Sequence, residues 1–129
     1  MIQTIPYWLQ NAIDFLNIEF QVDEDVNVSI LYGFDSVCVD EDNCGFAAYN
    51  NETKSIFLAD PAMLIDICET EEDVRQTTIM NLFHEYRHHQ QCIDDLDLSE
   101  DDAEDFAKQM YEEYINIVER ICEEWIEIE

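Results

Sequence analysis

The sequence predicts an α+β fold made of one helix, a small antiparallel sheet of about three strands, and two further helices. Three observations lead to this prediction. Apolar residues recur at helical spacing near the start of the chain and again after residue 70. Between these regions, residues 26–32 alternate with the period of a strand, and two short apolar arms flank the turn residues 50–53. A chain of 129 residues can bury a core without staples, so we expect one domain.

The first two elements follow from capping and turn residues. The first helix is expected to begin near Thr4, which can cap it, with Pro6 in its opening turn, and to reach about Gln21. A strand over residues 26–32 is expected next. It should end at Gly33, since glycine is typical of turns.

The middle of the chain is expected to complete the sheet. Residues 34–39 can form another short strand, and residues 40–45 form an acidic turn. The segments 45–49 and 54–59 are expected to be the two arms of a hairpin, which Asp60-Pro61 closes.

Two capping patterns predict the starts of the later helices. Thr70, with Asp73 three residues on, is a variant of the capping box and predicts a long helix to about Gln91. Ser99 with Asp102 repeats the pattern and predicts a final helix. That helix carries small and apolar residues at helical spacing, namely Ala103, Phe106, Ala107, Met110, Tyr114, Ile117, Val118, Ile121 and Trp125.

The composition excludes some functions. With 32 acidic residues against five Lys and Arg, the net charge is −27, which argues against nucleic acid because affinity for phosphates comes from basic side chains. Cations and basic peptides or proteins are the expected partners. No segment predicts a signal peptide or a membrane span. The five cysteines are odd in number and lack C-x-x-C spacing, so we expect a reducing, cytoplasmic location; nothing predicts the oligomeric state.

All three histidines of the chain lie within residues 84–89, in a segment predicted to be helical. His84 and His88 are four residues apart, so one helical turn places both imidazoles on one face, where they can share a tetrahedral Zn²⁺. Glu85 lies about 100° round the helix from His84 and is expected to take a proton from water as a general base. His89 lies about a further 100° round the helix from His88 and cannot easily share the same metal. We therefore expect it to be a surface or hydrogen-bonding histidine.

Two acids compete for the place of the third protein ligand that a water-activating zinc site needs. Asp94 follows His88 by six residues, a place that some zinc sites use, but the sharp turn required there usually has glycine where this chain has Gln91. Glu100 follows the capping residue Ser99 and opens the last predicted helix. The spacing alone leaves both acids open.

Two motifs together resemble a known family. H-E-x-x-H at residues 84–88 is followed by E-x-x-A-E-x-F-A at residues 100–107, and this pair resembles the gluzincin metallopeptidases, especially the minigluzincins and the ImmA/IrrE-type peptidases. The resemblance implies a zincin-like metallopeptidase domain over residues 1–129. It also implies that Glu100 is the third zinc ligand and that Glu104 supports a ligand histidine.

The chain departs from the family pattern at two positions. Arg87 stands before the second histidine, where the family usually has a small uncharged residue, and Glu104 stands where Asp is commoner. We expect Arg87 to turn outward to the carboxylates of the surface. The resemblance further implies an edge strand that lies above the active-site helix and pairs with extended substrate. Residues 54–59 are the expected strand, unless they only complete the sheet.

The sequence therefore predicts a zinc-dependent metallopeptidase that hydrolyses peptide bonds by a zinc-activated water, with Glu85 as general base. Its substrates would be peptides or proteins, with basic ones favoured by the charge. Two alternatives stay open. One is an acidic decoy that imitates the phosphates of DNA and binds a basic partner, and the other is a zinc-binding pseudoenzyme or latent proenzyme.

Overall fold

The computed structural model describes residues 5–20, 29–34, 37–38, 44–60, 64, 68, 70–94 and 99–128. These residues form an α+β structure, as predicted. Its elements in chain order are α1 (Tyr7–Phe20), β1 (Ser29–Phe34), β2 (Val37–Cys38), β3 (Cys44–Gly45), β4 (Ala47–Asn50), β5 (Ser55–Ala59), α2 (Glu71–Ile93) and α3 (Glu100–Ile128).

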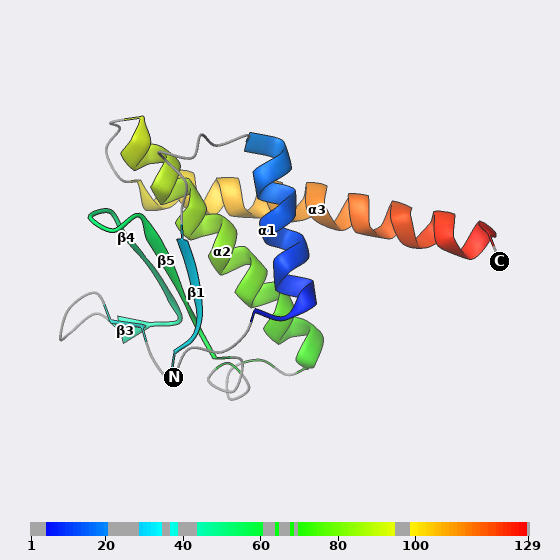
Figure 1. Cartoon of the computed structure of the whole chain (residues 1–129), viewed down its shortest axis with the longest axis horizontal. Coiled ribbons are helices and arrows are strands. Elements are labelled where there is room, and N and C mark those ends of the chain that lie inside the picture. The colour runs from blue at the N-terminus through cyan, green and yellow to red at the C-terminus, as the bar shows by residue number, and fades with distance from the viewer. Residues whose placement is uncertain are drawn as a thin grey trace.

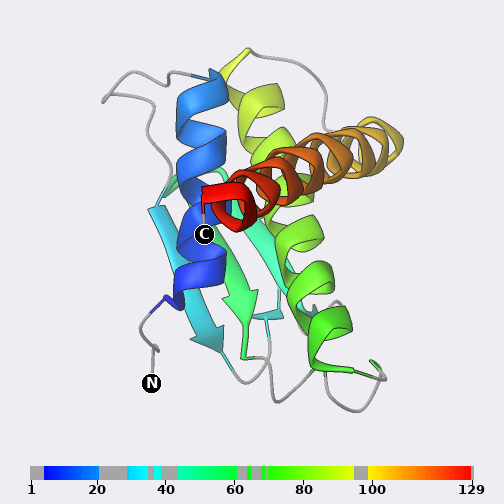
Figure 2. The ribbon, with the colours of Figure 1, turned by 90° about the vertical axis from the view of Figure 1, so that its right-hand side faces the viewer.

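The elements are stacked in layers (Figure 1). The main sheet has the strand order β1-β5-β4, and β2 pairs with β3 in a separate ribbon. Helices α1 and α2 lie side by side against one face of the main sheet, and α3 crosses them on the side away from the sheet (Figure 2). The C-terminal half of α3 extends beyond the other elements. No helix among the described residues has the length and apolar character needed to cross a membrane.

The main sheet is mixed, so the prediction of an antiparallel sheet is wrong for one strand pair. β4 and β5 form the predicted antiparallel hairpin, but β1 runs parallel to β5. A parallel pair requires a long connection, which the segment from residue 35 to residue 54 supplies. The alternation of apolar and polar residues predicts that a strand forms. The direction of that strand depends on which free edge of the sheet it joins.

β1 also ends later than predicted. The register between β1 and β5 shifts between Tyr32 and Phe34, around Gly33, whose φ of 104° is available to glycine without strain. The strand therefore continues through a bulge to Phe34. Its predicted beginning, residues 26–28, lies outside the described residues. The additional strand predicted over residues 34–39 is the short β2. The turn predicted over residues 40–45 is wrong at its end, because residues 44–45 form β3 and pair with β2, whereas residues 40–43 lie outside the described residues.

The predicted starts of α2 and α3 match the structure. The hydroxyl of Thr70 accepts the N–H of Asp73 at 3.1 Å, and the hydroxyl of Ser99 accepts the N–H of Asp102 at 3.2 Å. In α1, the carbonyl of Pro6 accepts the first helical hydrogen bonds, while the predicted cap Thr4 lies outside the described residues. These caps fix where α2 and α3 begin, and the beginning of α3 is where the candidate site lies.

The core lies between the sheet and the three helices. Phe15 of α1, Phe83 of α2 and Tyr114 of α3 meet with ring centroids 5.4–6.1 Å apart. The small Ala103 and Ala107 of α3 are buried, and small side chains allow helix axes to approach closely. Close packing of α3 on α2 brings the carboxylates of the first α3 turns to the histidines of α2.

Candidate metal centre

The candidate site lies where the C-terminal half of α2 meets the first turns of α3. The rings of His84 and His88 are neighbours on one face of α2, with centroids 4.9 Å apart. Glu100 is the first residue of α3 and reaches both rings. One ligand atom from each of these three residues lies within 4.8 Å of the others, so the group is close enough to hold a metal ion.

The contacts of the His84 and His88 rings with carboxylates require an additional positive charge in the cluster. His84 Nε2 lies 3.0 Å from Glu100 Oε2, and His84 Nδ1 lies 3.2 Å from Glu104 Oε1. His88 Nε2 lies 3.0 Å from the other oxygen of Glu100. A neutral imidazole carries one N–H, so His84 cannot donate to two carboxylates at once. The cluster needs either an extra proton or a metal cation among these groups.

A metal cation satisfies the donor set in one consistent way. His84 would donate its Nδ1–H to Glu104, which leaves Nε2 of that ring and the carboxylate of Glu100 for the ion. Two imidazole nitrogens and one carboxylate form one of the ligand sets of catalytic zinc sites, which keep a further position open. The side chain of His88 is 7% exposed, whereas that of Glu100 is 76% exposed. The site is therefore buried on the side of His88 and open to solvent on the side of Glu100.

Glu85 lies beside this group on α2. Burial raises the pKa of its carboxyl above the ordinary value, whereas the neighbouring His88 and His84 act in the opposite direction, and Glu100 raises it further. A carboxylate with a raised pKa is a stronger base, which suits proton transfer from water near neutral pH.

Arg87, the predicted departure from the family pattern, points to α3. Its Nε donates to Asp102 Oδ2 at 2.7 Å, its Nη1 donates to Gln90 Oε1 at 3.0 Å, and the guanidinium lies 5.3 Å from the ring centre of Phe106. The hydrogen bond from Arg87 lowers the pKa of the Asp102 carboxyl. The guanidinium of Arg87 is therefore paired with the carboxylate of Asp102, which is not a member of the candidate metal group.

Of the two acids that compete for the third position, the structure brings Glu100 to the histidines. Asp94 is exposed at the C-terminal cap of α2, where its backbone N–H bonds to the carbonyl of Gln90. Within the described part of the chain, the candidate group contains Glu100 and does not include Asp94.

His89 is fully buried, so the expectation of a surface histidine is wrong and the hydrogen-bonding alternative is correct. Its Nδ1 shares a hydrogen bond of 2.8 Å with the hydroxyl of Tyr49 on β4. β4 covers the side of α2 on which His89 lies, and this side is therefore buried although it carries a polar residue. Tyr49 was not predicted as a partner, since the two residues are forty positions apart.

The strand predicted to pair with substrate is also corrected. β5, which contains most of residues 54–59, is the central strand and is paired on both sides. Its backbone has no free edge for a peptide. β4 is an edge strand of the main sheet and packs on α2 beside the candidate site.

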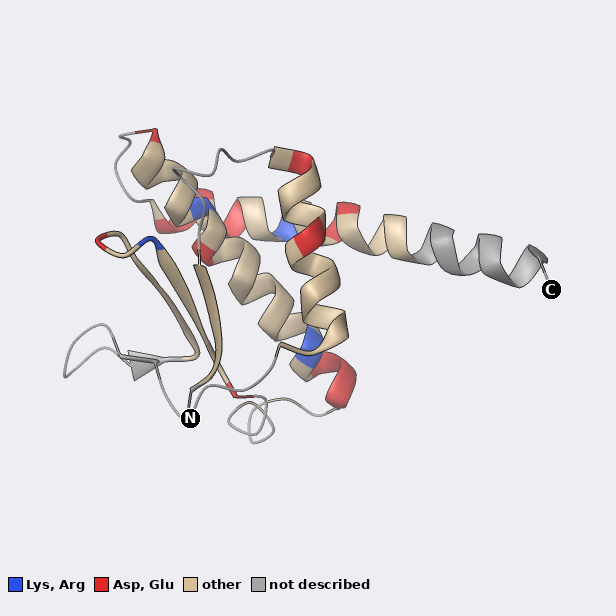
Figure 3. Ribbon diagram, in the orientation of Figure 1, with Lys and Arg blue, Asp and Glu red and all other residues tan. Residues whose placement is uncertain are grey.

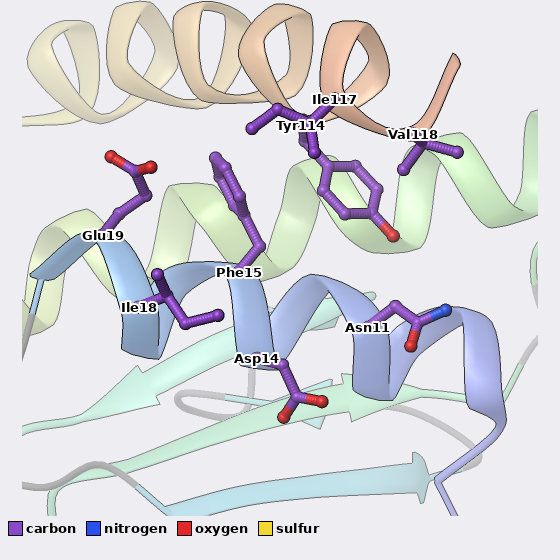
Figure 4. A pocket seen from close by; sticks show the side chains of 8 residues that line it. All are labelled: Asn11, Asp14, Phe15, Ile18, Glu19, Tyr114, Ile117 and Val118. Carbon is purple, nitrogen blue, oxygen red and sulfur yellow. The ribbon is translucent and has the colours of Figure 1, made fainter. Parts of the chain in front are cut away.

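A separate apolar groove lies between α1 and α3 (Figure 4). It has a volume of about 530 Å³ and shares no residue with the candidate metal group. Apolar side chains of both helices line it, with Asp14 and Glu19 on the α1 side.

Along the described ribbon, positions of Asp and Glu outnumber those of Lys and Arg (Figure 3). Among the Lys and Arg side chains that the structure describes, Arg87 is the one paired with a carboxylate next to the candidate site. Comparisons of the chain with models of protein families, with curated proteins and with solved structures found no match.

Proposed function

We propose that this protein is a zinc-dependent metallopeptidase of the gluzincin type, in which His84, His88 and Glu100 hold the metal. The observation that carries the proposal is the meeting of two imidazole nitrogens and a carboxylate within 4.8 Å. The H-E-x-x-H and E-x-x-A-E-x-F-A motifs support the same reading, since they supply these three residues together with Glu85 and Glu104.

Glu85 and Glu104 have different roles in the proposed reaction. A bound zinc ion would polarise the scissile carbonyl and make a water more acidic. Glu85 would take the proton of that water and then pass it to the leaving amine, and the burial that raises its pKa favours the protonated state between the two transfers. Glu104 would hold the ring of His84 in one orientation by accepting its Nδ1–H.

The proposed substrates are peptides or proteins, with basic side chains favoured. The net charge of −27 attracts cationic chains and repels anionic ones. An extended peptide would pair with the edge strand β4, since backbone hydrogen bonding to an exposed sheet edge is a common mode of peptide recognition. A cytoplasmic location is proposed from the odd number of cysteines and their lack of paired spacing.

Metal analysis tests the first half of the proposal. Protein purified without a polyhistidine tag, and then offered zinc, should retain about one equivalent per chain, because three ligands are placed together. A chain that binds no zinc would defeat the enzyme proposal and would favour the acidic decoy, which needs only the surface charge.

Glu85→Gln tests the second half. The amide fills the same space but cannot accept a proton, so cleavage of a peptide library rich in Lys and Arg should fall by about 10²–10⁴-fold while zinc binding is kept. Glu72→Gln is the matched control, because Glu72 is an exposed acid in the first turn of the same helix. Equal cleavage by the Glu85 variant and the wild type would show that Glu85 is not the base. Zinc binding without cleavage by the wild type would favour the pseudoenzyme or the proenzyme.

A further inference from the structure

Gln91 is a buried polar residue one helical turn after His88, with 2% of its surface exposed. Its amide is fully hydrogen-bonded. Oε1 lies 3.0 Å from His88 Nδ1 and accepts the N–H of Ser99 at 3.1 Å. Nε2 donates to Asp102 Oδ2 at 2.7 Å and to the carbonyl of Ser99 at 3.3 Å. One side chain of α2 thus connects a histidine of the candidate metal group to the first turn of α3.

The partners of this amide determine its orientation. The carboxylate of Asp102 and the carbonyl of Ser99 can only accept hydrogen bonds, so the NH₂ group of Gln91 must face them. The backbone N–H of Ser99 can only donate, so it must face the oxygen. The reversed amide would place an oxygen against the Asp102 carboxylate and an NH₂ group against an N–H.

The orientation of the amide decides which nitrogen of His88 carries the proton. Gln91 Oε1 accepts only, so His88 Nδ1 must be the donor in their contact at 3.0 Å. In the neutral ring Nε2 then has no hydrogen, and this nitrogen faces Glu100 Oε1 at 3.0 Å. Nε2 of His88 is therefore presented to the candidate metal group in the form that binds a metal.

Asp102 is itself held in place. Arg87 Nε donates to the same oxygen that accepts from Gln91, and the hydroxyl of Ser99 accepts the backbone N–H of Asp102. Arg87 and Gln91 lie four positions apart on α2 and contact the same carboxylate oxygen. The two residues belong to one hydrogen-bonded network that ends at His88.

We propose that Gln91 is a positioning residue, anchored by Asp102 and Arg87, that holds the His88 ring with its Nδ1 protonated and its Nε2 directed to the metal. This inference rests on the proposed metal site, but not on the reaction that the site would perform. Partners that hold ligand histidines in this way typically contribute 10–100-fold to metal affinity.

The test is the zinc affinity of the full chain, measured by competition with a chromophoric chelator. Gln91→Met keeps the length of the side chain and removes its hydrogen bonds, and it should weaken zinc binding by about 10–100-fold. Gln90→Met is the matched control. Gln90 is the adjacent glutamine, hydrogen-bonded to Arg87 and not to a candidate ligand, so its variant should bind zinc like the wild type.

Gln91→Glu separates positioning from a structural role. A carboxylate can still accept from His88 Nδ1 and from the N–H of Ser99, but it faces the Asp102 carboxylate and the Ser99 carbonyl. The Glu variant should therefore bind zinc more tightly than the Met variant, although its unfolding in urea should show no greater stability. A residue that only joins α2 to α3 would give the same order of variants in both measurements.

Nitrogen NMR of the zinc-loaded protein supplies a second readout. The wild type should show a protonated Nδ1 and a zinc-bound Nε2 for His88, and the Met variant should lose the protected Nδ1–H signal. Equal zinc affinity of wild type and Gln91→Met would overturn the inference and leave the metal site intact. Zinc binding that depends on Gln91 in a chain without peptidase activity would uphold it and defeat the proposed reaction, whereas a wild type that binds no zinc would overturn both.

Discussion

The C-terminal half of α2 has histidines on two sides, and these sides differ in their partners rather than in burial. His88 is 6% exposed and His89 is 0% exposed. On the side of α3, His88 lies between the carboxylate of Glu100 and the amide of Gln91. On the side of the sheet, His89 contacts the hydroxyl of Tyr49. A carboxylate facing an unprotonated nitrogen requires a proton or a metal cation between them, whereas a hydroxyl can donate to a ring nitrogen or accept from it.

The electrostatics of Tyr49 agree with this difference. Burial raises the pKa of its hydroxyl, and the nearby Cys92 raises it further, so Tyr49 is neutral throughout the physiological range. The side of the sheet therefore presents no anion to His89 through this contact. Depth of burial therefore does not separate the two histidines, whereas these two contacts differ in charge: a carboxylate lies at Nε2 of His88, and a neutral hydroxyl lies at Nδ1 of His89.

The largest effect is expected from a comparison of the two adjacent histidines. His88→Ala removes a proposed ligand and should weaken zinc binding by more than the roughly 10–100-fold that follows loss of an outer partner. His89→Phe should leave zinc affinity within a few-fold of the wild type, because its ring faces the sheet. Chelator competition measures both. A similar loss in the two variants would show that the two sides of α2 are not distinct.

A smaller effect is expected for the carboxylate ligand. Glu100→Ala should weaken zinc binding clearly, but less than His88→Ala, because the exposed position lets water take the vacated place. Asp94→Ala should bind zinc normally, since Asp94 lies at the exposed end of α2. A weakened site in the Asp94 variant beside an intact one in the Glu100 variant would exclude the gluzincin arrangement.

The side of the sheet should affect stability instead of metal binding. Tyr49→Phe leaves the Nδ1 of buried His89 without this partner and should cost about 1–3 kcal/mol of unfolding free energy. The double variant with His89→Phe should cost less than the sum of the single variants, because it removes both partners. Urea unfolding gives these values. Strictly additive costs would mean that the hydrogen bond contributes nothing.

The smallest effect is expected from Asp102→Asn in the metal-free protein. Arg87 lowers the pKa of the Asp102 carboxyl, so its charged form is favoured by folding. This contribution is present above the ordinary pKa of 3.8 and is lost as the pH falls through the lowered value. The difference in urea midpoint between wild type and variant should therefore shrink below pH 3.8. A difference independent of pH would place the effect in packing alone.

Several features were predictable because they depend on residues close together in the chain. The caps Thr70 and Ser99 bond to N–H groups three residues on, so their patterns predicted where α2 and α3 begin. The pairing of His84 with His88 follows from the helical repeat in the same way. The approach of Glu100 was expected only through the family resemblance, and the structure places it at both rings.

The sequence by itself determined where the helices and the longer strands form and that two histidines share a face, because these properties arise from neighbours within a few positions. The tertiary structure decided the parallel direction of β1, the burial of His89 and the partners of Gln91. Each of these depends on a surface contributed by a distant segment. A glutamine at residue 91 is compatible with a helix whatever its surroundings. It can orient the His88 ring only where α3 places Ser99 and Asp102 against it.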